Sequence, residues 1–147
     1  MNQIRVLLVD DEPFMAVVDV LKDDPELNVT FEYNPRLAIR RIRSGLEYDV
    51  LVTDLAFHIN PFQGYDDVSV EEMGVNHDGY LVTEVSRAIH PQTPIIITSA
   101  YSDQRLRLAT KQVRSVTLIS KMELSEDIFT LNKRIKEVVM STPPSPE

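Results

Sequence analysis

Five short apolar runs, each separated from the next by a longer segment, constrain the fold of this chain more than any other feature. The runs are rich in Val, Ile and Leu, and they lie at residues 4–9, 29–33, 49–54, 94–100 and 115–120. Strands that are covered on both faces have this near-continuous apolar composition, and such strands belong to parallel sheets with right-handed crossovers. The runs therefore predict one parallel sheet of five strands.

The segments between these strands carry apolar residues at helical spacing, so the chain alternates strand and helix. We expect helices over residues 13–23, from Asn34-Pro35 to Gly45, over 81–89, from Ser102 to Val113, and from a Ser125 cap to Val138. Pro13 is expected in the first turn of the first helix. The alternation predicts an α/β fold with a doubly wound parallel sheet and the flavodoxin-like strand order 2-1-3-4-5.

The connection between the third strand and the third helix is unusually long. It covers residues 55–78, whereas connections of this kind usually have about 2–6 residues, and long loops are often functional. We interpret it as an inserted flap beside the strand ends. Its side chains, His58 and His77 among them, suit a solvated acidic loop better than a second metal site. The domain is then expected to span residues 1–141, with the proline-rich residues 142–147 as a disordered tail or the start of a linker.

The composition disfavours several classes of function. With 147 residues, 43% of them hydrophobic, the chain has the size of one domain with its own core. Its net charge of −8 disfavours direct binding to nucleic acid, and the lack of cysteine excludes disulfides and thiolate chemistry. No apolar run approaches the about 18 residues of a membrane span, and the charged N-terminal residues are unlike a secretory signal. We therefore expect a cytoplasmic protein without membrane contact.

Carboxylates stand at the ends of two predicted strands. Asp10 and Asp11 follow the first strand, and Asp54 closes the third. In the order 2-1-3-4-5 these strands are neighbours at the switch point of the sheet, where ligands bind beyond the carboxyl ends of the strands. The three carboxylates should therefore converge on one crevice. Hard oxygen donors of this kind suit Mg²⁺, which keeps water for a phosphoryl oxygen.

Two further groups are expected at the same edge of the sheet. Ser99 brings a hydroxyl at the end of the fourth strand, and Lys121 brings an ammonium group just past the fifth. A carboxylate nucleophile, a divalent metal, a hydroxyl and an ammonium suffice to accept a phosphoryl group and stabilise its oxygens. The alternative interpretations are less specific. The carboxylates can be helix caps, the serine can bond its own backbone, and the lysine can be solvated.

Five short motifs, taken in their order along the chain, resemble those of the response-regulator receiver domain of two-component signalling, the class to which the chemotaxis receiver belongs. They are VLLVDDEP, DVLVTDL, DGYLV, PIIITSA and LISK, and the match spans roughly residues 4–140. The resemblance implies a signalling module that is phosphorylated in a Mg²⁺-dependent reaction and then rearranges the face formed by helix 4, strand 5 and helix 5. It implies a protein that is no enzyme beyond self-catalysed phosphotransfer and dephosphorylation. The implied partners are a sensor histidine kinase or phosphotransfer protein, a fused output domain or protein target, and a second copy in a homodimer.

The resemblance also implies roles for individual residues. Asp54 is then the phosphoacceptor, Lys121 contacts the phosphoryl group, and Ser99 is the switch hydroxyl. The implied metal ligands are Asp10, Asp11, Asp54 and the backbone carbonyl of Ala56.

The chain departs from the receiver pattern at two positions besides the insertion. Met122 follows the lysine, where the family usually has a proline in a cis peptide. Leu118 stands at the position of the aromatic switch residue on the fifth strand, so a rotamer switch of an aromatic ring is excluded there. Tyr101 is expected at the mouth of the site, where it would shield the phosphoryl group from water and slow its loss.

Other functions fit the sequence less well. A metal-dependent phosphohydrolase with an aspartyl intermediate would need two aspartates at alternate positions after the first strand, so that both point into the crevice. Here Asp10 and Asp11 are adjacent and residue 12 is Glu. A degenerate receiver that works without phosphorylation stays open because of Met122 and the insertion. Nucleotide binding is disfavoured, since four glycines leave no phosphate-binding loop after the first strand. The arginines of the second helix are more typical of a solvated face than of a docking patch. They are Arg36, Arg40, Arg41 and Arg43.

Overall fold

The computed structural model describes residues 3–54, 78–99 and 116–141, and its centre is one sheet of five strands. All neighbouring strands are parallel, and their order is β2-β1-β3-β4-β5. The strands are β1 (Ile4–Val9), β2 (Leu27–Glu32), β3 (Val50–Asp54), β4 (Ile95–Ser99) and β5 (Val116–Ser120). The predicted parallel sheet and its strand order are therefore confirmed.

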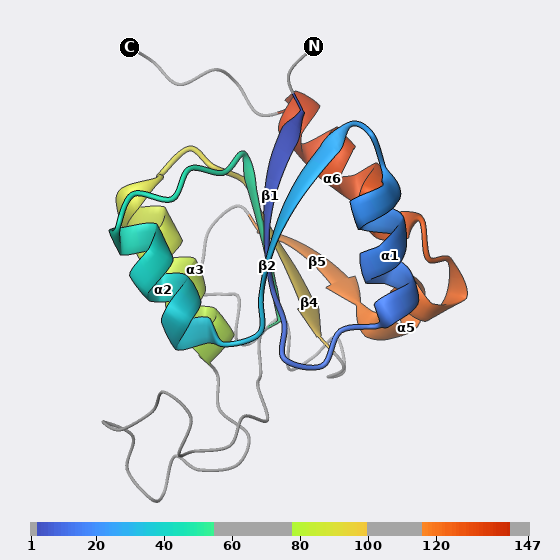
Figure 1. The fold of residues 1–147 in the computed structure, drawn as a ribbon, viewed down its shortest axis with the longest axis horizontal. Helices are drawn as coiled ribbons and strands as arrows, with labels where there is room; N and C mark the ends of the chain where they lie inside the picture. The colour runs from blue at the N-terminus through green and yellow to red at the C-terminus, as the bar shows by residue number, and fades with distance from the viewer. Residues whose placement is uncertain (1–2, 55–77, 100–115, 142–147) are drawn as a thin grey trace, which may run out of the picture.

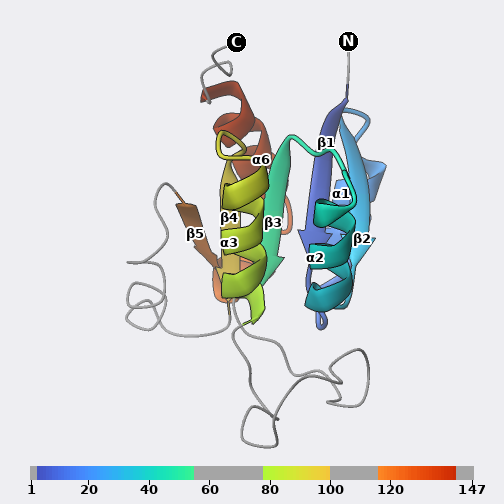
Figure 2. The same ribbon diagram turned by 90° about the vertical axis from the view of Figure 1, so that its left-hand side faces the viewer.

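Helices cover both faces of this sheet, so the domain has three layers. Figure 1 shows α2 and α3 on one side of the sheet and α1, α5 and α6 on the other, and Figure 2 shows α2 and α3 side by side in front of the strands. The helices are α1 (Met15–Asp23), α2 (Pro35–Arg43), α3 (Asp78–Ile89), α5 (Lys121–Glu126) and α6 (Thr130–Ser141). None of the helices in the described ranges is both long enough and apolar enough to cross a membrane.

Two hydrophobic clusters hold the layers together, one on each face of the sheet. Along β1, the side chains of Leu7 and Val9 pack toward α2 and α3, whereas Val6 and Leu8 pack toward α1, α5 and α6. All four are almost fully buried. Because successive residues of a strand point to opposite faces, a strand that is buried on both sides needs an unbroken apolar sequence. This requirement explains why the strands were recognisable in the sequence.

The predicted ends of α2 are confirmed by local hydrogen bonds and backbone geometry. The side chain of Asn34 accepts hydrogen bonds from the backbone N–H groups of Arg36 (2.9 Å) and Leu37 (3.4 Å). Pro35 occupies the first turn, where its missing N–H costs nothing. After the helix, Gly45 has a φ of +102°, a left-handed conformation that favours glycine.

Two predicted helix ends are wrong. The first helix begins at Met15, because Phe14 occupies the N-cap position with an extended backbone and Pro13 therefore lies before the helix. The last predicted helix is two helices, α5 and α6. Ser120 caps α5 by accepting a hydrogen bond from the N–H of Glu123 (3.2 Å), whereas the hydroxyl of Ser125 donates to the carbonyl of Met122 (2.7 Å) and caps nothing.

The break between α5 and α6 lies at Asp127, whose backbone is extended. The carboxylate of Asp127 accepts a hydrogen bond from the N–H of Phe129 (2.9 Å) and so turns the chain into α6. Leu124 before the break and Leu131 after it pack into the same cluster. The apolar spacing therefore continues across the break and could not reveal it.

Some predictions fall on segments that the structure does not describe. The helix expected from Ser102 to Val113 and the tail at residues 142–147 lie outside the described residues. The same holds for the predicted insertion, except that its last residue, Asp78, is the first residue of α3.

A buried hydroxyl pair links α3 to the segment before β3, and it provides a test of the packing. The Tyr48 hydroxyl lies 2.6 Å from the Ser86 hydroxyl, and both side chains are buried. We expect Tyr48→Phe to lower the free energy of unfolding by about 1 kcal/mol, because the Ser86 hydroxyl loses its partner in the interior. Urea denaturation measures this. Tyr33→Phe is the matched control, since that ring is 57% exposed, and an equal loss in both variants would contradict the assigned role.

Candidate functional site

Three aspartates meet at the carboxyl ends of β1 and β3. The two strands are paired in parallel, with Val9 opposite Thr53, so the next residues, Asp10 and Asp54, leave the sheet side by side. Asp11 joins them, and one carboxylate oxygen from each of the three residues lies within 4.8 Å of the others. The structure thus brings together the three carboxylates that the strand order predicted.

Asp10 and Asp54 are both about 95% buried, each with an exposed fraction of 5%, whereas Asp11 is half-buried. The backbone N–H of Glu12 donates a hydrogen bond to Asp10 Oδ1 (2.9 Å) and fixes its orientation. Burial raises the pKa of the Asp10 carboxyl, although the charge of Lys121 and the Glu12 N–H both oppose that shift. The site therefore holds a carboxylate whose ionised form the protein interior disfavours.

Lys121 lies between the two buried aspartates. Its Nζ is 2.9 Å from Asp54 Oδ2 and 3.1 Å from Asp10 Oδ2, and it also donates to the backbone carbonyl of Glu12 (3.4 Å). Burial alone would lower the pKa of the Lys121 ammonium, but the charges of Asp10 and Asp54 outweigh it, so the pKa is raised. The ammonium is thus held in its charged form against both carboxylates.

The position of this lysine follows from the chain on either side of it. Lys121 is the first residue of α5 and directly follows β5, so its backbone starts at the same edge of the sheet as the aspartates. The Ser120 cap fixes the start of α5. The contact with the carbonyl of Glu12 was not predicted from the sequence, because a backbone acceptor in a loop leaves no signal in residue types.

The cluster suits a divalent cation by charge and by donor chemistry. Three ionised carboxylates and one ammonium leave two negative charges uncompensated among these four groups. All the donors are hard oxygens, the ligands that Mg²⁺ prefers. Ligand oxygens at about 2.1 Å from one Mg²⁺ lie at most about 4.2 Å apart, so oxygens within 4.8 Å need only a small rotation or one bridging water. Asp10, Asp11 and Asp54 therefore fit a single Mg²⁺.

The remaining predicted site residues lie at or beyond the limits of the described chain. Ser99 is the last residue of β4, opposite Ser120 of β5, so its backbone lies at the edge of the sheet that carries the aspartates. Its side chain is outside the described part. Ala56 and Tyr101 also lie outside the described residues.

The two departures from the receiver pattern that the structure describes have clear positions. Leu118 is half-buried on β5 and packs against the cluster beneath α2 and α3. Met122 is 71% exposed in the first turn of α5, and the peptide bond that joins it to Lys121 is trans, since no cis peptide occurs in the described ranges. The chain therefore enters a helix directly after the lysine.

Response regulators are among the solved structures that match this fold. A response regulator receiver protein from Sinorhizobium medicae matches with a TM-score of 0.70 and 24% identity, over 96% of this chain and 98% of that one. The response regulator domain of Thermotoga maritima CheB matches with a TM-score of 0.66 and 19% identity, over 97% and 100%. The Salmonella typhimurium response regulator RcsB matches with a TM-score of 0.66 and 18% identity, over 100% of this chain and 65% of that one.

These matches define the class of fold. The chain has the fold of response-regulator receiver domains, with the strand order and helical layers described above. Comparison of the sequence with family profiles and with curated proteins gave no match. The resemblance that the sequence motifs indicated is therefore confirmed at the level of the fold.

The raised pKa of Asp10 makes a prediction about stability in the absence of metal. The folded state holds the Asp10 proton more tightly than the unfolded state does, so stability falls as the pH rises from the ordinary value of 3.8 through the raised folded value. Asp10→Asn removes this loss and leaves Lys121 paired with Asp54. We therefore expect the variant to be more stable than the wild type at neutral pH in metal-free buffer, with the difference vanishing below about pH 3.8.

Thermal unfolding at several pH values measures this difference. Asp19→Asn is the matched control, because it makes the same substitution at an exposed position on α1. Added Mg²⁺ should stabilise the wild type more than Asp10→Asn. A variant that is less stable than the wild type at neutral pH would contradict the assigned cost of the buried carboxylate.

Proposed function

We propose that this chain is a phosphoacceptor receiver module, in which Asp54 accepts a phosphoryl group in a Mg²⁺-dependent reaction. One observation carries the proposal: the Asp54 carboxylate lies 2.9 Å from the Lys121 ammonium inside a cluster of three carboxylates. A carboxylate there can act as a nucleophile, and a cation next to it can stabilise the phosphoryl oxygens that arrive. The receiver fold supports the same function.

The reaction assigns a separate role to each residue. A carboxylate oxygen of Asp54 attacks phosphorus in line with the bond to the donor, and that bond breaks with its electron pair leaving on the donor atom. The product is an acyl phosphate on Asp54. Lys121 donates from its Nζ to a phosphoryl oxygen, and Ser99 supplies a hydroxyl to another.

The metal site completes this assignment. We assign Asp10, Asp11 and Asp54, together with the backbone carbonyl of Ala56, as the residues that hold Mg²⁺. When bound, Mg²⁺ would neutralise charge on the phosphoryl oxygens. Asp10 and Asp11 would keep the ion beside Asp54. Burial disfavours the Asp10 charge and raises the pKa of that carboxyl, and a bound cation would relieve this cost.

Phosphorylation would act on the rest of the domain through Lys121. In the structure described here the lysine contacts both Asp10 and Asp54. A phosphoryl group on Asp54 competes for the ammonium and shifts the start of α5, because Lys121 is its first residue. In the receiver pattern, the signal is carried by the face that helix 4, strand 5 and helix 5 form. The structure describes β5 and the two helices that follow it, α5 and α6.

The partners follow from this chemistry. The phosphoryl group would come from a sensor histidine kinase or a phosphotransfer protein, and the signal would pass to a fused output domain, a protein target or a second copy. RcsB, whose solved chain is described for its interaction with DNA, is longer than the region that this chain matches. The net charge of −8 argues against direct binding of nucleic acid by this domain. We propose that it works in the cytoplasm and is no enzyme beyond its own phosphotransfer and dephosphorylation.

The proposal predicts where a small phosphodonor reacts. Acetyl phosphate with Mg²⁺ should phosphorylate the wild type at Asp54, and chelation of the metal should abolish the reaction. Intact mass measurement followed by peptide mapping of the acyl phosphate tests both points. Asp54→Asn should stay unmodified, whereas Asp11→Asn should react only at much higher Mg²⁺, because it loses one ligand and keeps the nucleophile. A phosphoryl group on another residue, or equal phosphorylation without metal, would contradict the proposal.

A further inference from the structure

A small hollow of about 20 Å³ lies next to the aspartate cluster, on the side of the sheet that α1, α5 and α6 cover (Figure 1). Seven of its ten lining residues are apolar, and the other three are Asp10, Thr98 and Lys121. A cavity needs about 10–15 Å³ of space open to a water-sized sphere to hold one water molecule. The hollow therefore has room for a water molecule and for no larger ligand.

Thr98 gives this hollow a specific requirement. It lies on β4, is only 3% exposed, and presents its side chain to the same face of the sheet as Ile96, which packs into the hydrophobic cluster beneath α1, α5 and α6. No hydrogen bond joins the Thr98 hydroxyl to another residue of the described part of the chain. By comparison, the buried hydroxyl of Thr53 donates to the backbone carbonyl of Asp54 (2.9 Å). Because a buried hydroxyl without a partner is costly, Thr98 calls for a partner inside the hollow.

Asp10 and Lys121 bring charge to the same hollow. Asp10 Oδ1 accepts hydrogen bonds from the N–H of Glu12 (2.9 Å) and from Lys121 Nζ (3.2 Å), and Asp10 Oδ2 lies 3.1 Å from the same Nζ. An ionised carboxyl can accept about four hydrogen bonds, so Asp10 retains room for one more donor. The hollow thus contains a hydroxyl that needs a partner and a carboxylate that can accept a further hydrogen bond. A water molecule can serve both, because it accepts and donates.

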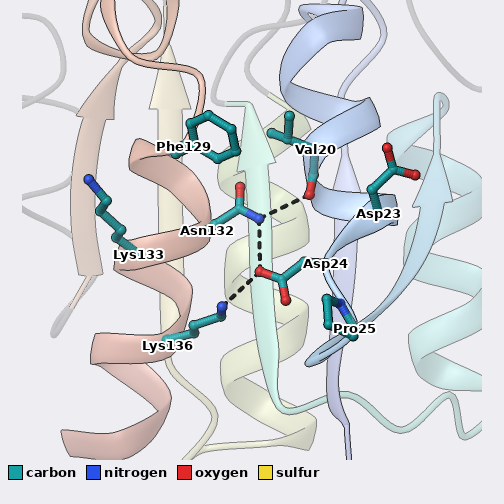
Figure 3. A pocket seen from close by; sticks show the side chains of 8 residues that line it. All are labelled: Val20, Asp23, Asp24, Pro25, Phe129, Asn132, Lys133 and Lys136. Carbon is teal, nitrogen blue, oxygen red and sulfur yellow. Dashed lines mark hydrogen bonds and ion pairs between the residues drawn. The ribbon is translucent and has the colours of Figure 1, made fainter.

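The spacing of the helices around the hollow is fixed by hydrogen bonds outside it. Figure 3 shows Asn132 of α6 beside α1, where its Nδ2 donates to the backbone carbonyl of Val20 (3.1 Å) and to Asp24 Oδ2 (3.0 Å). Lys136, one turn further along α6, pairs with the same Asp24 oxygen at 2.8 Å. Leu131 directly precedes Asn132 and lines the hollow. Shrinking the hollow would therefore disturb these contacts between α1 and α6.

We propose that this hollow binds one water molecule, which accepts a hydrogen bond from the Thr98 hydroxyl and donates one to the Asp10 carboxylate. The charge of the Lys121 ammonium attracts the oxygen of this water. Cavities that stay dry are apolar, whereas the three polar side chains here meet the usual requirement of two to four partners. Thr98 is then a positioning residue, which acts on the aspartate cluster through the water. The inference concerns the metal-free protein and does not rest on the proposed phosphorylation.

Thr98→Val tests the proposal, because it removes the hydroxyl and keeps the shape of the side chain. With a water in the hollow, the variant deprives that water of one partner, so we expect a lower midpoint of urea denaturation and an unfolding equilibrium constant about fivefold larger. In a dry hollow, the same change would remove a buried hydroxyl without a partner and would raise the midpoint. Thr30→Val is the matched control, since it makes the same substitution at a half-buried position on β2 outside the hollow and should not lower the midpoint.

NMR of the carboxyl carbons in the metal-free protein shows whether Thr98 acts on Asp10 through its hydroxyl. We expect Thr98→Val to shift the Asp10 carboxyl signal, because the carboxylate loses the hydrogen bond from the water. Thr98→Ser keeps the hydroxyl and should leave the signal close to that of the wild type, although it removes a methyl group. Thr30→Val should leave the signal unchanged. Equal shifts in Thr98→Ser and Thr98→Val would show an effect of packing alone and would overturn the role assigned to Thr98.

A crystal structure of the metal-free protein locates the water directly. We expect one water molecule within hydrogen-bond distance of the Thr98 hydroxyl and the Asp10 carboxylate in the wild type, and none at that place in Thr98→Val. A wild-type hollow without water, or a Thr98→Val variant that is more stable than the wild type, would overturn the proposal. No phosphodonor and no Mg²⁺ enter these measurements, so their failure would leave the proposed function of Asp54 untouched.

Discussion

The contact of Lys121 with Asp10 and Asp54 is the interaction on which the site depends. These residues follow or end β5, β1 and β3, so the two ion pairs join the carboxyl ends of three strands. A partly buried ammonium between two buried carboxylates costs desolvation energy, and burial raises the pKa of Asp10 accordingly. The clusters on both faces of the sheet provide the apolar burial that lets the fold hold these charges.

This arrangement makes the site responsive to cations and anions. Without a divalent cation, Asp10 and Asp54 share the Lys121 ammonium, which is therefore placed where an incoming phosphoryl group would need it. Under the proposed function, a ligand that brings its own charge would change which carboxylate Lys121 contacts, and the first turn of α5 would move with the lysine, its first residue. The same electrostatic imbalance that lowers stability would thus provide the driving force for the proposed switch.

Most of the fold could be predicted from the sequence, because strands buried on both faces leave unbroken apolar runs such as residues 4–9. The meeting of Asp10 and Asp54 followed from strand order alone. The details that failed depend on single hydrogen bonds: Ser120 caps α5 where Ser125 was expected, and Asp127 breaks a helical pattern whose apolar spacing continues. The hydrogen bonds from the Asn132 side chain to the Val20 carbonyl and to Asp24 could not be predicted at all, since an asparagine in a helical pattern does not reveal which acceptors it will meet.

A crystal structure with Mg²⁺ and beryllofluoride, a mimic of the phosphoryl group, tests the central claim most directly. The account predicts beryllium bonded to a carboxylate oxygen of Asp54 and Mg²⁺ on Asp10 and Asp11. It also predicts that the Lys121 ammonium contacts a fluoride and has given up its 3.1 Å contact with Asp10. A structure in which Lys121 still bridges Asp10 and Asp54 while the mimic is bound, or in which the mimic binds another residue, would contradict it.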